Sequence, residues 1–139
     1  MLSNSYDRRI EFRDCDPAQI VFSGNYYAFI DFGTHLLFEK AGWPVGTAFE
    51  TFGILGFPLV ESSCQFKAPC KYGETVTITS TIARYGRTSF DVAHTVTRDG
   101  VLCVEGLEKR VWVVTDPETG RMKSAPLPDI VVERFNQDG

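Results

Sequence analysis

The sequence has little of the chemistry on which metal sites and catalytic triads depend. His35 and His94 are its only histidines, and it contains no Gly-x-Ser-x-Gly motif. Its cysteines form no Cys-x-x-Cys pair and lie at no zinc-ligand spacing from a histidine. They are Cys15, Cys64, Cys70 and Cys103. We therefore expect no metal site and no disulfide framework, but reduced thiols, as is typical of a cytoplasmic protein.

Long apolar runs, a leader segment and an excess of basic residues are also missing. No stretch approaches the roughly 20 apolar residues that span a bilayer, and residues 1–6 lack the features of a signal peptide. The net charge of −4 argues against nucleic-acid binding, which needs a concentrated basic surface. The length of 139 residues favours one globular domain over residues 1–139.

One long segment has apolar residues at helical spacing, and several others alternate between apolar and polar residues. The spacing predicts a helix over residues 25–41. Ser23 or Asn25 is a suitable cap for its start, and Gly42 stands where it would stop. The other predicted elements are a strand over 6–13, a short helix over 45–51, strands over 59–67, 75–84, 88–98 and 101–114, and a Pro-rich tail from 124 onward.

Tight turns join the later strands. Asp99-Gly100 is a strong hairpin signal, and Gly86 marks a second turn. Strands joined by such short connections run antiparallel, and the missing crossover helices exclude a parallel doubly wound sheet. The apolar helix must bury its face against these strands. We therefore predict an α+β fold, in which a curved antiparallel sheet wraps around one long central helix.

The most informative stretch runs from Asp14 to Tyr26. It places Asp16 at a turn marked by Pro17, a few residues before the long helix. An aspartate before proline commonly initiates a turn, so a purely structural role stays open. A helix start, however, offers unpaired N–H groups that can polarise a carbonyl. A nearby carboxylate can then attack that carbonyl or activate a water, so the stretch indicates acyl-transfer chemistry.

This stretch resembles the 4-hydroxybenzoyl-CoA thioesterase family, whose members have the hot-dog fold. The resemblance is carried by Ile10-Glu11-Phe12-x-Asp14-Cys15-Asp16-Pro17-Ala18-x-Ile20-Val21, followed by Asn25-Tyr26. It implies that Asp16 is the nucleophile or general base against a thioester, and that the backbone N–H of Ser23 points at the thioester oxygen. The sequence departs from the family at Gln19, where glycine is usual, and at Ser23-Gly24, which replaces bulkier pairs.

The helix supplies the candidates for contact with the acyl group. In the resembled family, the aspartate that matches Asp31 faces a hydroxyl group on the aromatic ring; a structural partner for Asp31 is the alternative. Gly24 would let a ligand approach the backbone. Tyr26 is a candidate for the wall of an aryl pocket, although an aromatic stripe is also typical of plain core.

The resemblance places the phosphates of coenzyme A at the turn that contains Arg87, Thr88 and Ser89. Arginine suits phosphate because it binds in a bidentate manner, although exposed basic groups at a turn are often only solvated. Fallback candidates are Lys67, Lys71 and Arg110. No cofactor is expected, because coenzyme A is part of the substrate.

The leading interpretation is therefore an enzyme that hydrolyses an acyl-CoA thioester, in particular an aryl one such as a hydroxybenzoyl-CoA. A non-catalytic acyl-CoA binding module is the alternative, but such modules normally accompany a further domain. A hot-dog hydratase or dehydratase needs an Asp-His pair, and the spacing of Asp16 and His35 does not fit one. The resemblance also implies a homodimer or homotetramer, and covering an exposed sheet edge gives dimerisation a physical reason.

Overall fold

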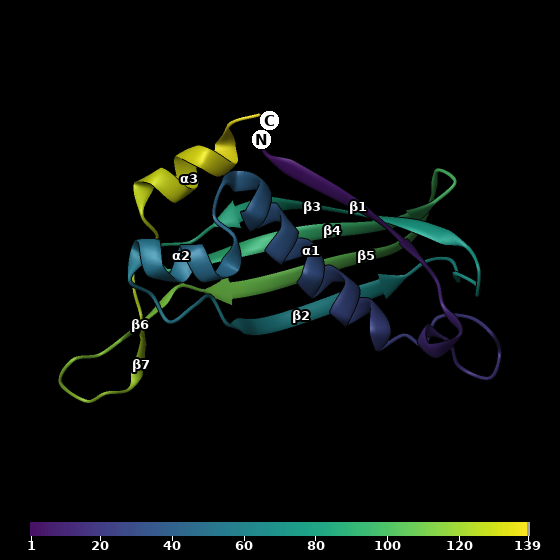
Figure 1. Cartoon of the computed structure of the whole chain (residues 1–139), viewed down its shortest axis with the longest axis horizontal. Helices are drawn as coiled ribbons and strands as arrows, with labels where there is room; N and C mark the ends of the chain where they lie inside the picture. The colour runs from purple at the N-terminus through teal and green to yellow at the C-terminus, as the bar shows by residue number, and fades with distance from the viewer. Residues whose placement is uncertain (139) are drawn as a thin grey trace.

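The computed structural model describes residues 1–138 and consists of a curved sheet with helices on one side (Figure 1). In chain order its elements are β1 (Ser3–Arg9), the 3-10 turn η1 (Phe12–Asp14), α1 (Asn25–Ala41), α2 (Val45–Phe52), β2 (Leu59–Phe66), β3 (Thr75–Tyr85), β4 (Ser89–Arg98), β5 (Val101–Val111), β6 (Val113–Thr115), β7 (Met122–Ser124) and α3 (Asp129–Asn136). Five strands form an antiparallel sheet in the order β1-β3-β4-β5-β2, while β6 and β7 pair separately. The predicted α+β class is confirmed.

Helix α1 occupies the residues that its spacing predicted, and a glycine sets how closely it approaches the sheet. A Cβ atom on Gly33 would lie 2.5 Å from Oγ of Ser80 on β3 and 3.4 Å from Nδ1 of His94 on β4. Glycine at this position therefore lets the helix lie directly on the centre of the sheet. The helix ends at Gly42, whose φ of +104° makes the left-handed C-terminal cap that glycine favours.

The start of α1 differs from the prediction. Gly24 is the N-terminal cap residue, and no side chain caps the helix. Ser23 therefore does not cap it, and the side chain of Asn25 instead donates a hydrogen bond to the carbonyl oxygen of Asp14 at 2.7 Å. The consequence is that the helix start is fastened to the turn that precedes it.

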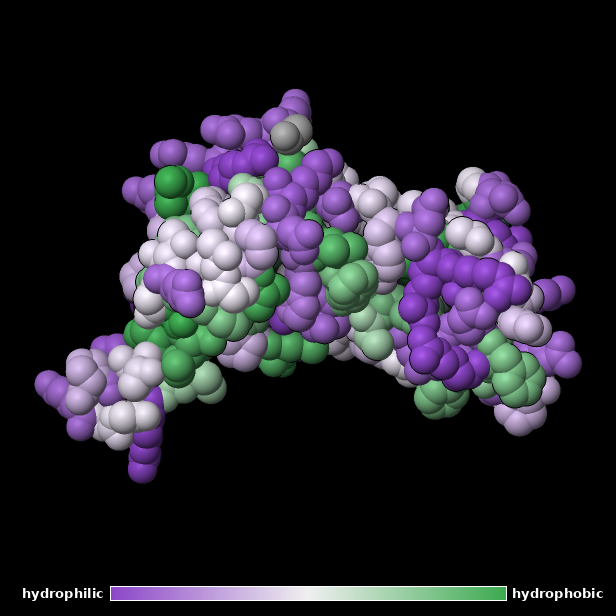
Figure 2. Space-filling view, in the orientation of Figure 1, coloured by the Kyte–Doolittle hydropathy of each residue, from purple (hydrophilic) through white to green (hydrophobic). Residues whose placement is uncertain are grey.

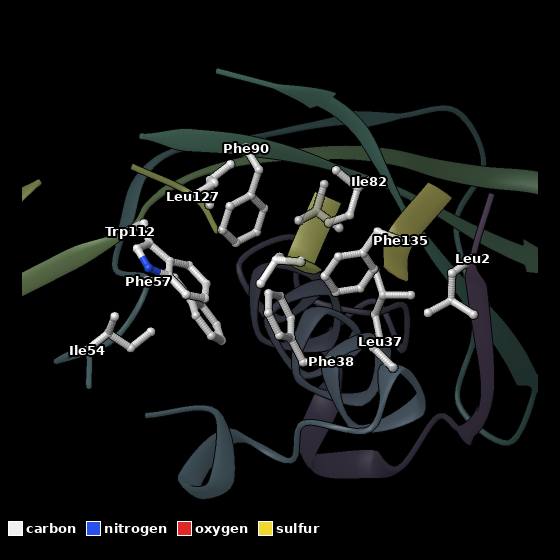
Figure 3. Close-up of a cluster of buried hydrophobic side chains, with 13 residues drawn as sticks. Leu2, Leu37, Phe38, Ile54, Phe57, Ile82, Phe90, Trp112, Leu127 and Phe135 are labelled. Atoms are coloured by element: carbon white, nitrogen blue, oxygen red, sulfur yellow. The ribbon is translucent and has the colours of Figure 1, made fainter. Parts of the chain in front are cut away.

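Aromatic rings fill the space between the C-terminal half of α1 and the sheet (Figure 3). The ring of Phe38 stacks on Phe57 with centroids 4.4 Å apart and meets Phe135 of α3 edge-on at 4.9 Å. Burying one such side chain contributes about 1.5–3 kcal/mol. A second buried cluster lies under the N-terminal half of α1 and includes Ile10, Val21, Tyr26, Phe29 and Val104.

Two predicted strands extend too far. The first strand ends at Arg9, because Glu11 and Asp14 cap each other around the turn η1. Phe12, which lies inside the predicted strand over 6–13, is consequently outside β1 and is 71% exposed. The last strand breaks at Trp112, whose buried ring packs among the aromatic residues of the core; the chain beyond it forms the separate β6–β7 hairpin.

The other predicted strands, the short helix and both turns agree with the structure to within one residue. Asp99 and Gly100 have φ values of +50° and +77°, as the hairpin signal requires. The predicted Pro-rich tail is wrong in part, because it contains α3. Val131 and Phe135 of α3, four residues apart and both buried, hold that helix against the core.

Candidate active site

A tight hairpin over residues 14–22 leads into α1 and holds the predicted catalytic aspartate. Cys15 and Val21 form a β-bridge. The N–H of Asp16 donates to the carbonyl of Ile20 at 3.0 Å, and the N–H of Phe22 donates to the carbonyl of Asp14 at 2.9 Å. These bonds fix Asp16 on one arm of the hairpin, opposite the residues that lead directly to Ser23.

The turn at the tip of this hairpin uses one carboxylate oxygen of Asp16. Oδ1 accepts a hydrogen bond from the N–H of Ala18 at 2.9 Å, which is the turn-forming role weighed above. Among residues 1–138, Oδ2 has no hydrogen-bond partner. Gln19, where the resembled family has glycine, keeps the turn by adopting a left-handed conformation with φ of +65°. The turn therefore survives this departure, and Asp16 retains one available acceptor oxygen.

Asp14, two residues earlier, has a structural role. Its carboxylate is buried, pairs with Arg8 at 2.8 Å and accepts the N–H of Glu11 at 2.8 Å. Between them lies Cys15, whose thiol pKa is raised by burial and by the negative charges of Asp14 and Asp16. A thiol with a raised pKa is a poor nucleophile near neutral pH, so Cys15 does not compete with Asp16 for that role.

The helix start presents unused backbone donors. The N–H groups of Asn25 and Tyr26 donate to the carbonyls of Phe22 and Ser23. Within the described part of the chain, by contrast, no hydrogen bond uses the N–H of Ser23 or of Gly24. Such donors at a helix N-terminus can stabilise the negative charge that develops on a carbonyl oxygen.

Ser23 lies on the wall of a largely apolar cavity of about 480 Å³. The cavity is lined by Ile20, Val21, Ser23, Tyr26, Phe66, Lys67, Ala68 and Pro69. The rings of Tyr26 and Phe66 lie 5.7 Å apart, and burial, together with the neighbouring Cys70, raises the pKa of Tyr26. Tyr26 thus supplies an aromatic wall rather than a base. The predicted site residues Asp16 and Gly24 are close in sequence to residues that line this cavity. Neither of them lines the cavity within one chain.

Asp31 lies one-third of the way along α1 and has a partner in the sheet. Its Oδ1 is 2.5 Å from Nη2 of Arg110 on β5, yet 46% of its side chain is exposed. Arg110 itself is buried and also pairs with Glu108 at 3.0 Å. It is therefore engaged within the chain, which removes it from the fallback candidates for phosphate binding.

Glu108 is a charged residue at the centre of the core that we did not single out from the sequence. It accepts hydrogen bonds from Thr34 and Arg110 and lies 3.2 Å from Nε2 of His94. Burial alone would raise its pKa, but the hydrogen bonds from His94, Arg110 and Thr34 outweigh burial and lower the pKa to about 2. The alternation along β5 contained the signal, because Glu108 shares the inward face with Val104.

The predicted phosphate-binding residues lie far from the helix start. Ser89 pairs with Val111, and the carbonyls of Arg87 and Thr88 accept hydrogen bonds from Leu127 and Trp112. These contacts place the three residues at the end of the sheet where β3 finishes. The hairpin of Asp16 contacts the opposite end, since Ile20 pairs with Lys71 just before β3 begins. Along the eleven residues of β3, this separation is about 33 Å.

In residues 1–138, no cluster of histidine, cysteine and acidic side chains has the arrangement of a metal site. None of the helices described combines the length and apolar character needed to cross a bilayer. His35 lies in the C-terminal half of α1 and packs near Phe57, away from the hairpin that holds Asp16, so His35 and Asp16 do not form the Asp-His pair of a hydratase.

Comparison with known proteins adds to this geometry. The profile of the Thioesterase superfamily matches residues 18–104. The 4-hydroxybenzoyl-CoA thioesterase of Pseudomonas sp. (strain CBS-3) is 34% identical over 138 residues, which cover 94% of this chain and 96% of that protein. A structure of a mutant 4-hydroxybenzoyl-CoA thioesterase complexed with 4-hydroxybenzoyl CoA matches with a TM-score of 0.85 and 31% identity, over 96% of this chain and 99% of that one.

A gentisyl-coenzyme A thioesterase structure matches with a TM-score of 0.80 and 34% identity, over 96% of this chain and 100% of that one. The sequence and structural similarities thus extend over nearly the whole chain, and the residues matched by the family profile include the helix start described above. Together with the curved sheet wrapped around α1, they establish the hot-dog fold. The chain belongs to the Thioesterase superfamily, and it is a thioesterase.

Proposed function

We propose that this thioesterase hydrolyses an acyl-CoA whose acyl group is aromatic and hydroxylated, such as a hydroxybenzoyl-CoA. Asp16 attacks the thioester carbonyl or activates the water that attacks it, and the backbone N–H of Ser23 stabilises the developing oxyanion. The carbon–sulfur bond then breaks. Coenzyme A leaves as the thiol, and the acyl group, having gained the oxygen of water, leaves as the free acid.

The main support for this proposal is the free backbone donor at the start of α1. The N–H of Ser23, which has no partner in residues 1–138, belongs to the wall of an apolar cavity beside the hairpin that holds Asp16. A single oxyanion donor is worth about 10²–10³ in rate. A thioester has a good leaving group, so this donor and one carboxylate make up a sufficient set of catalytic groups.

The relatives support the substrate class. The two whose identity to this chain is 34% are a 4-hydroxybenzoyl-CoA thioesterase and a gentisyl-coenzyme A thioesterase. Each name specifies an aromatic acyl group with a hydroxyl substituent on coenzyme A. The aromatic wall formed by Tyr26 and Phe66 is compatible with such a ring.

We further propose that the working form is a homodimer. Arg87, Thr88 and Ser89 lie about 33 Å along the sheet from Asp16, which is too far for one pantetheine arm to span within a chain. Two chains related by a two-fold axis with antiparallel β2 edges would bring these residues of one chain toward Asp16 of the other. The coenzyme would then lie between subunits, and two such dimers could associate further as a tetramer.

The edge strand β2 suits this pairing. It has only β5 as a neighbour in the sheet, and Leu59, Val60 and Phe66 along it are exposed. Figure 2 shows apolar side chains along the lower edge of the molecule, where β2 lies in Figure 1. An uncovered apolar edge strand is an aggregation hazard, which pairing with a second copy would remove.

The experiment is a thiol-release assay over a panel of coenzyme A esters: 4-hydroxybenzoyl, 2,5-dihydroxybenzoyl, benzoyl, phenylacetyl and medium-chain alkanoyl. We expect turnover with the hydroxybenzoyl esters to exceed that with the alkanoyl esters. Tight binding of the panel without any thiol release would reject hydrolysis and favour the binding-module alternative. Equal turnover of all esters would reject the aromatic substrate class.

A further inference from the structure

A second cavity, which we call the β1 cavity, lies on the other side of α1 from the cavity beside Ser23. The strands β1 and β2 form opposite edges of the sheet, on either side of α1 (Figure 1). Phe66 of β2 lines the first cavity, whereas residues of β1 line the second. The volume of the β1 cavity is about 360 Å³, and small-molecule sites have about 300–1,000 Å³. Its lining includes Tyr6, Arg8, Arg13, Asn25, Phe29 and Phe32.

Two cations and one carboxylate line the β1 cavity. The carboxylate of Asp14 is satisfied within the chain, because Oδ1 lies 2.8 Å from Nη2 of Arg8 and Oδ2 accepts the N–H of Glu11 at 2.8 Å. In residues 1–138, neither Nη1 of Arg8 nor its buried Nε has a hydrogen-bond partner. Arg13 is exposed, and its side chain makes no ion pair or hydrogen bond within the same residues. The cavity therefore has a net charge of one cation, which suits a monoanion.

Aromatic rings make up the apolar part of this lining. The guanidinium carbon of Arg8 lies 4.5 Å from the ring centroid of Phe29, and the rings of Tyr6 and Phe32 meet edge-on at 5.2 Å. The hydroxyl of Tyr6 donates to the carbonyl of Phe29 at 2.6 Å. Burial raises the pKa of Tyr6 to about 12 despite the nearby charge of Arg8, so this phenol adds no negative charge. Cations beside aromatic faces favour a flat aromatic ring that carries an acid group.

We propose that the β1 cavity is a binding site for a small aromatic carboxylate, such as benzoate or a hydroxybenzoate. The carboxylate accepts hydrogen bonds from the guanidinium groups of Arg8 and Arg13, and the ring packs against Phe29 and Phe32. Inorganic phosphate would use the cations but not the rings, and an uncharged aromatic molecule would use the rings but not the cations. This site is additional to the one that holds Asp16, and the class of its ligand follows from the cavity, whichever ester the protein cleaves.

The β1 cavity shares two residues with the joint between the catalytic turn and α1. Asp14 and Asn25 line the cavity, and the side chain of Asn25 donates to the carbonyl of Asp14, two residues before Asp16. A bound acid therefore lies against the residues that fix the turn of Asp16. In the proposed function, the acid that hydrolysis releases belongs to the same chemical class. The cavity is thus placed to bind accumulated product outside the site of cleavage.

Calorimetric titration of the wild-type protein at pH 7 tests the proposal with four probes: 4-hydroxybenzoate, benzoate, 4-hydroxybenzamide and inorganic phosphate. We expect both acids to bind. The amide and phosphate should bind roughly tenfold more weakly or worse, because the amide lacks the charge and phosphate lacks the ring. No binding of either acid at millimolar concentration would overturn the proposal, and so would an affinity for the amide or for phosphate that equals the affinity for the acids.

Arg13→Gln identifies the cavity that the acid occupies. Because Arg13 is exposed and unpaired in the described residues, the variant should fold and keep the wild-type kcat. Its affinity for 4-hydroxybenzoate should fall roughly tenfold through loss of a charged hydrogen-bond donor. Arg121→Gln, the same substitution at an exposed position between β6 and β7, is the matched control and should bind as the wild type does. Equal affinities in the two variants would overturn the proposal.

A matched pair of phenylalanine variants separates the two cavities. Phe32→Leu removes an aromatic ring from the β1 cavity, and Phe66→Leu removes one from the cavity beside Ser23. The affinity for 4-hydroxybenzoate should fall roughly threefold in Phe32→Leu and stay unchanged in Phe66→Leu. The reverse result would place the acid in the cavity beside Ser23 and overturn the proposal. Absence of thiol release from every ester would reject only the proposed function, because none of these titrations depends on turnover.

Discussion

The carbonyl oxygen of Asp14 accepts two hydrogen bonds, from the side-chain amide of Asn25 at 2.7 Å and from the N–H of Phe22 at 2.9 Å. The first of these bonds fastens the first residue of α1 to the turn that holds Asp16. The distance between the carboxylate of Asp16 and the N–H of Ser23 therefore depends on it. Because both groups must act on one carbonyl, a small displacement should have a large effect on the rate.

Asn25→Ala should weaken catalysis without destroying the fold. We expect kcat for 4-hydroxybenzoyl-CoA to fall roughly tenfold, because the turn and the helix start are no longer fixed to each other. The free energy of unfolding should fall by about 1 kcal/mol for the lost hydrogen bond. Steady-state kinetics and urea unfolding measure the two effects. Asn136→Ala, at an exposed position at the end of α3, is the control. If kcat of Asn25→Ala equals kcat of this control, the expectation is contradicted.

Gln19→Gly should stabilise the protein. Gln19 has a φ of +65°, which costs a residue with a side chain about 1–2 kcal/mol relative to right-handed conformations. Glycine adopts this conformation without that cost, although it loses more entropy on folding, so the net gain should be about 1 kcal/mol. Urea unfolding provides the measurement. A lower free energy of unfolding in Gln19→Gly would contradict this expectation. It would show that the Gln19 side chain stabilises the folded protein by more than its left-handed conformation costs.

Gly33→Ala should be destabilising by about 1–3 kcal/mol, the cost of overpacking a filled interior. The new Cβ would lie 2.5 Å from Oγ of Ser80, and this hydroxyl is held by its bond to His94. Gly46→Ala in α2 is a matched control, because no atom lies within 4 Å of a Cβ at that position. Thermal unfolding should show a lower Tm for Gly33→Ala alone; equal Tm values for both variants would refute the close approach of helix and sheet.

The stability contributed by Glu108 should depend on pH. Its pKa is lowered from 4.5 to about 2 in the folded protein, so folding favours the charged form. The stabilisation is complete above pH 4.5 and is lost as the pH falls from there toward 2. It amounts to about 3 kcal/mol at neutral pH.

Urea unfolding of Glu108→Gln across this range tests that expectation. The variant should be less stable than the wild type at pH 7, and the gap between them should narrow as the pH falls below 4.5. Glu105→Gln serves as the control for all other groups that titrate in the same range. A gap between wild type and Glu108→Gln that stays constant from pH 7 to pH 3 would contradict the lowered pKa.

Much of the fold follows from local sequence patterns. The helix over 25–41 and the hairpin at Asp99-Gly100 could be predicted because the apolar spacing and the turn chemistry lie within a few residues of each other. Helix α3 was missed because Pro126 and Pro128 precede it and suggest a loop. Its actual signal, Val131 and Phe135 at a spacing of four, acquires meaning only once the core that receives them is known.

Some parts of the candidate site could be predicted from the sequence, and others could not. The turn around Asp16 and the donor at Ser23 are neighbours in sequence, so their combination could be expected. The pairing of Asp31 with Arg110 spans 79 residues, and no local pattern signals it. The separation of Arg87 from Asp16 by the length of the sheet also emerges only from the topology, because it depends on the direction in which β3 runs.

The most direct test of the central claim is a single-turnover measurement on Asp16→Asn with 4-hydroxybenzoyl-CoA, alongside binding of the same ester. If Asp16 is the nucleophile or general base, the rate of thioester cleavage should fall by about 10³-fold while the dissociation constant changes little. A cleavage rate within a few-fold of the wild type would exclude Asp16 from the chemistry and contradict the proposed mechanism.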